Sequence, residues 1–328
     1  MTTRRAVLQG LGGVLAGWGL SGVHAAEKGY PARPIHCQIG FPAGGATDSM
    51  MRIVGEVLSA SLGQPVIVEN RTGAAGTIAT GRVARAKPDG YTLGGIEASA
   101  LTISPALYDS LTYVPEQDFV FIGGVARIPC LLVVHPSLKV DDVHEFIELA
   151  RSEPALIRYG SGGVGSPLHL PMELLQLRTG IVMQHIPYAG SAPALVDLVA
   201  GRIEAALLDV STVHQYVQSG QIVALGMATA HRNVRLPDLP TFGEQGIDDF
   251  EVDPWVGLVA PAGISGEIQA LLEKSLMASV GDPALAKRLT EAGFNAFQAD
   301  GGELQRIMLA DKARWERVIR ERKISIEV

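Results

Sequence analysis

The sequence predicts an α/β fold of two lobes, with the second lobe inserted into the first. Short apolar runs of strand length alternate with helical segments, which is typical of mostly parallel sheets flanked by helices. The chain has 328 residues, of which 47% are hydrophobic, so two domains can each bury a core. A second strand–helix series interrupts the first, and two strands are expected to connect the lobes as a hinge. The expected limits are residues 26–129 with 254–328 for the first lobe and 130–253 for the second.

The first 25 residues resemble an export signal. Thr3–Gln9 contains two consecutive arginines, as twin-arginine signals do, and a Gly-rich apolar stretch follows from Leu11 to Val23. Val23-His24-Ala25 has the spacing of small residues that favours cleavage after Ala25. A retained membrane anchor is the alternative, but the apolar stretch is short for crossing a bilayer. We therefore expect a cleaved signal peptide and a periplasmic mature protein.

The glycine-rich turn Phe41–Asp48 is the feature around which we expect the first lobe to be organised. The apolar run Ile35–Phe41 precedes it, and a helical pattern that stops at Gly63 follows it. Glycines in such a turn leave backbone N–H groups uncovered at the start of a helix, where they attract anions. An ordinary strand-to-helix turn is the alternative. Three residues are candidate N-caps: Thr47, Asp48 and Ser49.

Two further strands are predicted in this lobe, Pro65–Glu69 and Thr92–Glu97, with the turn Asn70–Gly76 and the helix Thr77–Ala86 between them. Ligands of α/β sheets gather at the carboxyl ends of parallel strands, so the turns after these strands are expected at one edge. Glu97 stands at that edge beside Ala98-Ser99-Ala100. It is either a solvated edge charge or a pocket residue that pairs with a positive or N–H group of a ligand.

The inserted lobe is predicted from a second strand–helix alternation. Phe119–Val134 contains two apolar runs that Gly123-Gly124 and Pro129 interrupt. Later strands are expected at Leu131–His135, Ile157–Tyr159, Ile181–Ile186, Ile203–Leu208 and Val223–Ala228, and helices at Asp141–Arg151, from Ser166-Pro167 onward, and at Ala192–Ala200. The strand Trp255–Ala260 then returns to the first lobe, and helices follow at Gly266–Val280, Ala284–Ala292 and Glu303–Arg320.

The motifs that would indicate an enzyme or a cofactor site are incomplete or absent. Gly160, Gly162 and Gly165 match the dinucleotide fingerprint, but no acid follows about 20 residues later. The loop Gly160–Ser166 is therefore interpreted as a second helix start suited to an anion. His144-Glu145 lacks the second histidine that a zinc helix needs. The sequence also contains no nucleophile elbow and no phosphate-binding loop. We expect no catalytic residue, no metal and no cofactor.

The net charge and the cysteines bear on the partners and on the redox state of the protein. The net charge of −7 argues against nucleic acid and against an anionic membrane surface as partners. The two cysteines, Cys37 and Cys130, both lie in apolar strand-like runs, and two buried thiols are favoured over a disulfide. His169, one turn after Ser166, is either a structural histidine or part of the anion-suited turn.

Several motifs spread along the mature chain together resemble one family. They are Tyr30-Pro31-x-Arg33-Pro34-Ile35, Phe41-Pro42-x-Gly44-Gly45-x-Thr47-Asp48, Leu62-Gly63-Gln64-Pro65, Pro88-Asp89-Gly90-Tyr91, Gly165-Ser166-x-x-His169-Leu170, Pro187-Tyr188-x-Gly190, Leu236-Pro237-Asp238-Leu239-Pro240 and Trp255-x-Gly257-Leu258. The chain resembles the periplasmic receptors of tripartite tricarboxylate transporters, the Bordetella uptake gene (Bug) family. The resemblance implies a periplasmic-binding-protein (Venus-flytrap, type II) fold that closes on a small organic acid.

The resemblance also implies partners and a binding site. The receptor would be a non-enzymatic monomer that delivers its ligand to a large and a small permease subunit. An orphan sensor receptor is one alternative, and an enzyme on the same scaffold is a less favoured one. The expected ligand-binding residues are Phe41, Ala43, Gly44, Gly45, Thr47, Asp48, Glu97, Ser99, Gly163, Gly165, Ser166, His169, Tyr188, Gly190 and Asp209.

This sequence departs from the family pattern near the expected site. Glu97 stands where small hydroxyl residues or glycine are common, Ala189 where lysine is frequent, and Asp253-Pro254 where a small polar pair is usual. A carboxylate at Glu97 repels a second ligand carboxylate, and the alanine removes a positive charge. We therefore expect a monocarboxylate, an amide or an amino-bearing ligand rather than a tricarboxylate.

Overall fold

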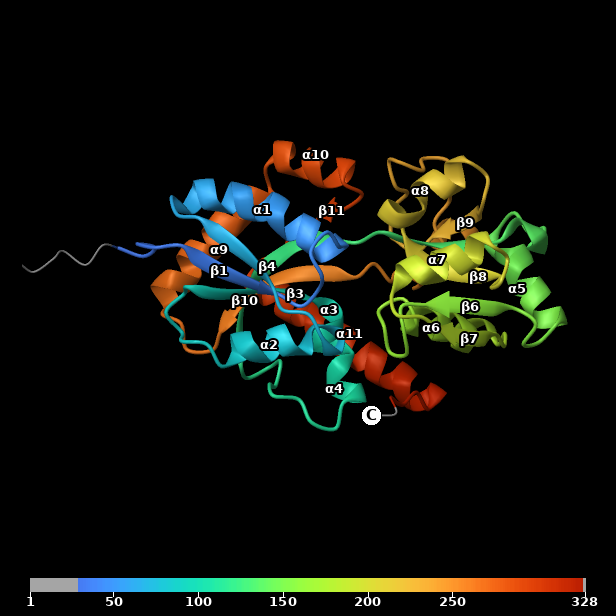
Figure 1. The fold of residues 1–328 in the computed structure, drawn as a ribbon, viewed down its shortest axis with the longest axis horizontal. Helices are drawn as coiled ribbons and strands as arrows, with labels where there is room; N and C mark the ends of the chain where they lie inside the picture. The colour runs from blue at the N-terminus through green and yellow to red at the C-terminus, as the bar shows by residue number, and fades with distance from the viewer. Residues whose placement is uncertain (1–28, 327–328) are drawn as a thin grey trace, which may run out of the picture. The chain divides into compact units, whose positions relative to one another are not determined.

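Two β-sheets organise residues 29–326, the part of the chain that this computed structural model describes (Figure 1). The first sheet has six strands in the order β11-β4-β10-β3-β1-β2. The bounds are β1 (Ile35–Ile39), β2 (Val66–Asn70), β3 (Thr92–Glu97), β4 (Phe119–Arg127), β10 (Trp255–Pro261) and β11 (Asn295–Ala296). The second sheet has the order β7-β6-β8-β5-β9. Its strands are β5 (Cys130–Val134), β6 (Arg158–Ser161), β7 (Gln184–Pro187), β8 (Ala205–Asp209) and β9 (Val223–Met227). The predicted signal peptide lies outside the described residues.

Both sheets are mixed. β1 pairs in parallel with β2 and β3, and β6 pairs in parallel with β7 and β8. β10 is antiparallel to β3 and β4, and β5 is antiparallel to β8 and β9. Strand–helix alternation sets the direction only of strands that a helix connects. The antiparallel pairs involve the strands by which the chain leaves and re-enters a lobe. The chain between the two strands of such a crossing is not α-helical, so the alternation did not reveal their direction and the sequence predicted mostly parallel sheets.

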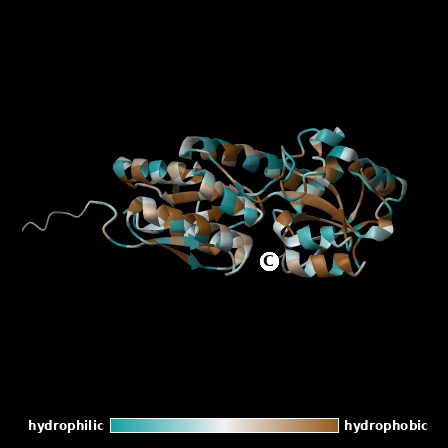
Figure 2. Cartoon of the chain, turned by 90° about the horizontal axis from the view of Figure 1, so that it is seen from above, coloured by the Kyte–Doolittle hydropathy of each residue, from teal (hydrophilic) through white to brown (hydrophobic). Residues whose placement is uncertain are grey.

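Helices cover both sheets, and the apolar residues gather on the strands between them (Figure 2). In the first lobe these are α1 (Ala46–Leu62), α2 (Thr77–Ala84), α3 (Ala98–Thr102), α4 (Ser104–Leu107), α9 (Gly266–Val280), α10 (Pro283–Glu291) and α11 (Gly301–Arg322). In the second they are α5 (Val143–Ser152), α6 (Leu170–Thr179), α7 (Ser191–Val199) and α8 (Val210–Gln218). Short 3₁₀ turns are η1 (Ala74–Gly76), η2 (Pro136–Leu138) and η3 (Gly243–Gln245). Among the described residues, no helix is long and apolar enough to cross a membrane.

The core of the first lobe forms around β10, every residue of which is buried. Trp255 and Val259 pack there with Leu304 and Met308 of α11. The Trp255 indole donates a hydrogen bond to Asp311 Oδ2 of the same helix at 2.8 Å. Burying such aromatic and aliphatic side chains contributes roughly 2 kcal/mol each, so the first half of α11 is fixed to this sheet.

Two short crossings connect the lobes. β4 ends at Arg127 and β5 begins at Cys130, so only Ile128 and Pro129 lie between the two sheets. The returning chain crosses beside them, where the Ile128 amide donates to the Pro254 carbonyl at 2.7 Å. Arg127 Nη1 also lies 3.0 Å from Asp253 Oδ1. The predicted hinge of two chain crossings is present. The crossings lie just before the strands that were expected to form them, because Leu131–Val134 and Trp255–Pro261 are already paired within their own sheets.

Several element boundaries differ from the prediction. β4 runs through Gly123-Gly124, where its pairing with β10 shifts register instead of ending. The predicted helix at Ser166 begins only at Leu170, and residues 167–169 form turns before it. The N-cap of α1 is Gly45, so none of the three candidate caps occupies that position. Cys37 and Cys130 are free and buried, in different sheets.

Candidate functional site

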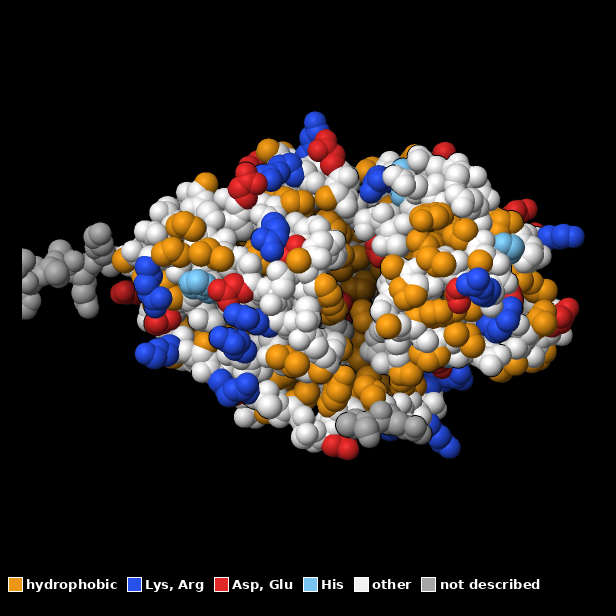
Figure 3. All heavy atoms as spheres, viewed as in Figure 1, with side chains coloured by type: hydrophobic (Ala, Val, Ile, Leu, Met, Phe, Trp, Pro, Cys, Tyr) orange, Lys and Arg blue, Asp and Glu red, His pale blue; other side chains and the backbone are white. Residues whose placement is uncertain are grey.

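A cavity of about 390 Å³ lies between the lobes, and it is lined from both sides of the hinge. In Figure 3 the surface is hollowed between the two lobes, and hydrophobic side chains line the hollow. The first lobe contributes the turn after β1 and the carboxyl end of β3, and the second contributes the turns after β6, β7 and β8. This is the edge at which α/β sheets bind ligands.

The turn between β1 and α1 presents an uncapped helix start to the cavity. Gly44 turns the chain with a φ of 80°, and Gly45 is the N-cap without any side-chain hydrogen bond to the helix amides. Gly45, Ala46 and Thr47 line the cavity. The first N–H groups of α1 therefore have no side-chain partner and carry the partial positive charge of the helix dipole.

Asp48 braces this turn from behind. Its Oδ2 accepts hydrogen bonds from the Gly44 amide at 2.9 Å and from Arg52 Nε at 3.0 Å, and its Oδ1 accepts from Asn70 Nδ2 at 2.9 Å. Desolvation alone would raise the pKa of Asp48, but these hydrogen bonds and the Arg52 charge lower it to about 2. Asp48 is thus an ionised structural residue that holds Gly44 in place and does not line the cavity.

Glu97 is a buried carboxyl group at the end of β3. It is 6% exposed and lines the cavity. Its partners are two hydroxyl groups, from Thr47 at 3.2 Å and Ser99 at 3.5 Å. Burial raises the pKa of Glu97 to about 7, and the charge of Asp209 acts in the same direction. A substantial fraction of this side chain is consequently protonated near neutral pH.

The second-lobe turn after β6 is held by His169. The Gly165 amide donates to His169 Nδ1 at 3.1 Å, and the His169 amide donates to Ser166 Oγ at 3.1 Å. His169 is the N-cap residue of α6 and is buried. Burial is the main cause that lowers the pKa of His169 to about 4, and the neighbouring His185 acts in the same direction. The ring is therefore neutral at neutral pH. Ser166 lines the cavity, and His169 fixes the turn behind it.

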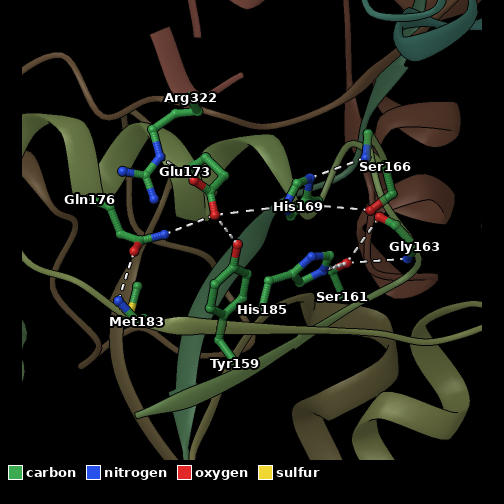
Figure 4. Close-up of polar contacts among 11 residues, drawn as sticks. Tyr159, Ser161, Gly163, Ser166, His169, Glu173, Gln176, Met183, His185 and Arg322 are labelled. Atoms are coloured by element: carbon green, nitrogen blue, oxygen red, sulfur yellow. Dashed lines mark hydrogen bonds and ion pairs between the residues drawn. The ribbon is translucent and has the colours of Figure 1, made fainter. Parts of the chain in front are cut away.

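A buried polar network continues from His169 to the end of α11 (Figure 4). Glu173 accepts hydrogen bonds from the Tyr159 hydroxyl, from Gln176 Nε2 at 2.9 Å and from Arg322 Nε. The His169 ring lies between this carboxylate, 3.7 Å from its Nε2, and the His185 ring, with centroids 3.9 Å apart. α11, which is packed on the first sheet, thereby reaches α6 of the second lobe and forms a third link between the lobes.

His185 connects the same network to the cavity turn by a second route. Its Nε2 lies 2.7 Å from Ser161 Oγ, and that oxygen accepts a hydrogen bond from the Gly163 amide at 3.2 Å. Both glycines of the turn are therefore positioned by buried side chains.

Two more helix starts of the second lobe face the cavity. Gly190, with a φ of 119°, is the N-cap of α7 and makes no side-chain cap. Gly190 and Ser191 line the cavity. At α8 the cap is Asp209, whose carboxylate accepts from the Thr212 amide at 2.9 Å and from the Thr212 hydroxyl at 2.8 Å. The cleft thus combines uncapped helix starts from both lobes with two carboxyl groups.

Comparison with known proteins shows to which family this chain belongs. The sequence model of the tripartite tricarboxylate transporter family receptors matches residues 50–324. The chain belongs to this receptor family. It is 36% identical over 293 residues to protein BugT of Bordetella pertussis, covering 89% of this chain and 90% of BugT.

Solved structures agree with the family assignment. The receptor is similar to the periplasmic binding protein BugD, with a TM-score of 0.77 and 32% identity over 91% of this chain and all of BugD. It is also similar to R. palustris Rpa4515 with adipate, with a TM-score of 0.80 and 33% identity over 90% of this chain and 99% of that one. MatC of Rhodopseudomonas palustris with bound malate has a TM-score of 0.75 and 29% identity over 88% of this chain and all of MatC. The protein is therefore a periplasmic solute-binding receptor with the two-lobed binding-protein fold, not an enzyme.

The receptor brings eight of the fifteen predicted residues to the cavity wall. These are Phe41, Gly45, Thr47, Glu97, Ser99, Ser166, Gly190 and Asp209. The other seven do not line the cavity: Ala43, Gly44, Asp48, Gly163, Gly165, His169 and Tyr188. Tyr188 donates its hydroxyl proton to Asp197 at 2.9 Å instead. Most of the seven shape a turn whose neighbours reach the cavity.

Lining residues that the sequence reasoning missed are mainly apolar and belong to the hinge and the loops. Ile128, Cys130 and Pro254 line the cavity because both crossings pass beside it. Ala75 and Leu168 also line it, from the second glycine-rich turn and from the segment before α6. The hinge residues were detectable in principle, since both crossings of a two-lobed fold must border the cleft. Among residues 29–326, no group of His, Cys, Asp or Glu side chains is arranged to hold a metal ion.

Proposed function

We propose that this receptor captures a small carboxylate in the cleft and delivers it to a tripartite transporter with a large and a small membrane subunit. The observation that carries the proposal is the pair of uncapped helix starts, at Gly45 and Gly190, that border one cavity from opposite lobes. A carboxylate between them accepts hydrogen bonds from both lobes, so binding favours the closed arrangement. The adipate and malate named for two structural relatives support a carboxylate as the ligand class.

We also propose where the mature receptor begins, which residues form each lobe, and that the receptor is a monomer. The mature chain begins after Ala25, the first lobe comprises residues 26–129 and 254–328, and residues 130–253 form the second lobe. It acts as a monomer. Mass spectrometry of the protein from the periplasm tests where the mature chain begins, and light scattering of the purified protein tests whether it is a monomer.

Substitution of Gly45 tests the binding mode. Gly45 has a φ of −76° and a ψ of 173°, which any residue adopts, so aspartate fits its backbone. In Gly45→Asp the new carboxylate caps α1 itself and occupies the amides that the ligand needs. We expect the free variant to be as stable as the parent or slightly more stable, and its carboxylate affinity to fall at least a hundredfold.

Gly45→Ala is the matched control, because a methyl group supplies neither a cap nor a charge. The added Cβ would lie 3.2 Å from the Pro42 carbonyl oxygen, which requires a small adjustment of the turn. We expect its affinity to stay within a few fold of the parent in calorimetric titrations. Equal affinities of the aspartate variant and the parent would contradict the binding mode. Delivery is tested by ligand uptake into vesicles that contain both permease subunits, which should require the receptor.

A further inference from the structure

The cavity wall carries two acidic side chains and, among the residues that the structure describes, no cationic one. Glu97 comes from the end of β3 in the first lobe and Asp209 from the end of β8 in the second. The other lining residues are apolar, glycine or hydroxyl residues, apart from the Cys130 thiol. Within residues 29–326, no Lys, Arg or His lines the cavity. A site of this composition repels a second ligand carboxylate and attracts a positive group.

Glu97 differs in its partners from the buried Asp48 and Glu173 and from the half-buried Asp253. Asp48 pairs with Arg52 at 2.8 Å, Asp253 with Arg127 at 3.0 Å, and Glu173 with Arg322. Within the described part of the chain, the salt bridges include none to Glu97, and its two hydrogen-bond partners are hydroxyl groups. Leaving a buried carboxyl group without a cation is costly, and the cost falls when a cation enters the site.

We propose that Glu97 determines the specificity of the receptor, by binding an ammonium or similar cationic nitrogen of the ligand between itself and Asp209. The ligand would then be a zwitterion: its carboxylate binds the uncapped helix starts and its cation binds the two acids. This inference rests on the proposed function, because it assigns the second end of a ligand whose first end is the captured carboxylate.

The groups around Glu97 determine whether the receptor releases or takes up a proton when the ligand binds. Thr47 of α1 and Ser99 of α3 donate to Glu97, and Asp209 faces it from the second lobe. Cys130 of β5 is a neutral thiol, because burial raises its pKa well above the ordinary value. The nearby Asp253 is paired with Arg127. A ligand cation lowers the pKa of Glu97 and releases its proton, whereas a ligand carboxylate placed there takes up a proton.

The experiment compares matched five-carbon probes on the purified mature receptor: pentanoate, 2-aminopentanoate, 5-aminopentanoate and glutarate. Affinity and enthalpy are measured by titration calorimetry at pH 7 in buffers of different ionisation enthalpy, which gives the protons exchanged. We expect at least one amino acid to bind tenfold or more tightly than pentanoate and glutarate. Its binding should release about half a proton, because the pKa of Glu97 is about 7 in the free protein.

Glu97→Gln keeps the shape of the side chain, and both hydroxyl neighbours remain able to bond to it: one donates to the amide oxygen and the other accepts from the amide nitrogen. In this variant the preference for the amino acid over pentanoate should fall at least tenfold, and the proton release should disappear. Affinity for pentanoate should change little. Glu69→Gln is the control, since Glu69 does not line the cavity and lies near the surface of the first lobe. Melting curves verify that both variants are folded.

The outcomes separate the two proposals. Tightest binding of glutarate with proton uptake, or an equal loss of all probes in Glu97→Gln, overturns the role of Glu97 and leaves carboxylate capture intact. Saturable carboxylate binding without any preference for an amino group does the same. If no probe of this series or of its two- to six-carbon homologues binds, carboxylate capture fails, and the inference about Glu97 fails with it.

Discussion

Arg322→Ala should destabilise the receptor far more than its place near the end of the last helix suggests. Arg322 donates to Glu173, whose side chain is 8% exposed, and the other donors to Glu173 are the neutral groups of Tyr159 and Gln176. Removing one partner of a fully buried ion pair costs about 3–5 kcal/mol. Arg322 is itself 30% exposed, so water can partly replace it, and we expect a loss of roughly 2 kcal/mol.

The assay is urea unfolding together with thermal melting of the mature receptor. A loss of that size lowers the melting temperature by roughly 4–8 °C in a chain of this length. The variants Glu173→Gln and Arg322→Ala, alone and combined, form a double-mutant cycle. The cycle should give a coupling of about 1–3 kcal/mol, because the loss in the single Arg322 variant comes from the unpaired carboxylate.

Arg320→Ala is the control, since Arg320 lies in the same last turn of α11 and is exposed. It should change the stability by no more than about 0.5 kcal/mol. Equal effects of the Arg320 and Arg322 variants would refute the argument, because they would show that Glu173 does not depend on α11 for its charge partner. A coupling near zero would refute it as well.

Three further predictions concern titratable groups. Burial keeps the pKa values of His169 and His185 at about 4, so the folded state binds fewer protons than the unfolded state below pH 6.5. The free energy of unfolding should therefore fall as the pH drops from 6.5 towards 4, and a flat urea midpoint over this range would argue against two neutral rings in the folded protein. Glu97 acts oppositely: its raised pKa makes the folded state bind more protons between pH 4.5 and 7. The Glu97→Gln variant should consequently gain stability relative to the parent as the pH rises through this range, by at most about 3 kcal/mol, and parallel pH profiles would contradict the shift. Cys37 and Cys130 are fully buried, and the pKa of Cys37 is raised to about 12 by burial, so neither thiol should react with Ellman's reagent until urea unfolds the protein. Rapid reaction of either thiol in the native protein would disprove this.

The sequence by itself determined the local geometry of the receptor. Apolar runs bounded by turns located β1 and β3 to within two residues, and Gly63 ended α1 in the left-handed conformation that glycine favours. Glycine-rich turns after strands also indicated which segments border the cleft. These signals are readable because they depend on the backbone preferences of a few neighbouring residues.

The tertiary structure decided which groups meet. No local sequence pattern indicates that Asp48 holds Gly44 in place or that the partners of Glu97 are hydroxyl groups. Nor does one indicate that His169 holds the turn instead of lining the cavity. The contact of Arg322 with Glu173 joins residues 149 positions apart. Such pairings depend on how the sheets twist and on how far α11 extends beyond the first lobe. The charge of each buried group depends on these long-range contacts, because its pKa is set by its neighbours in space and not by those in sequence.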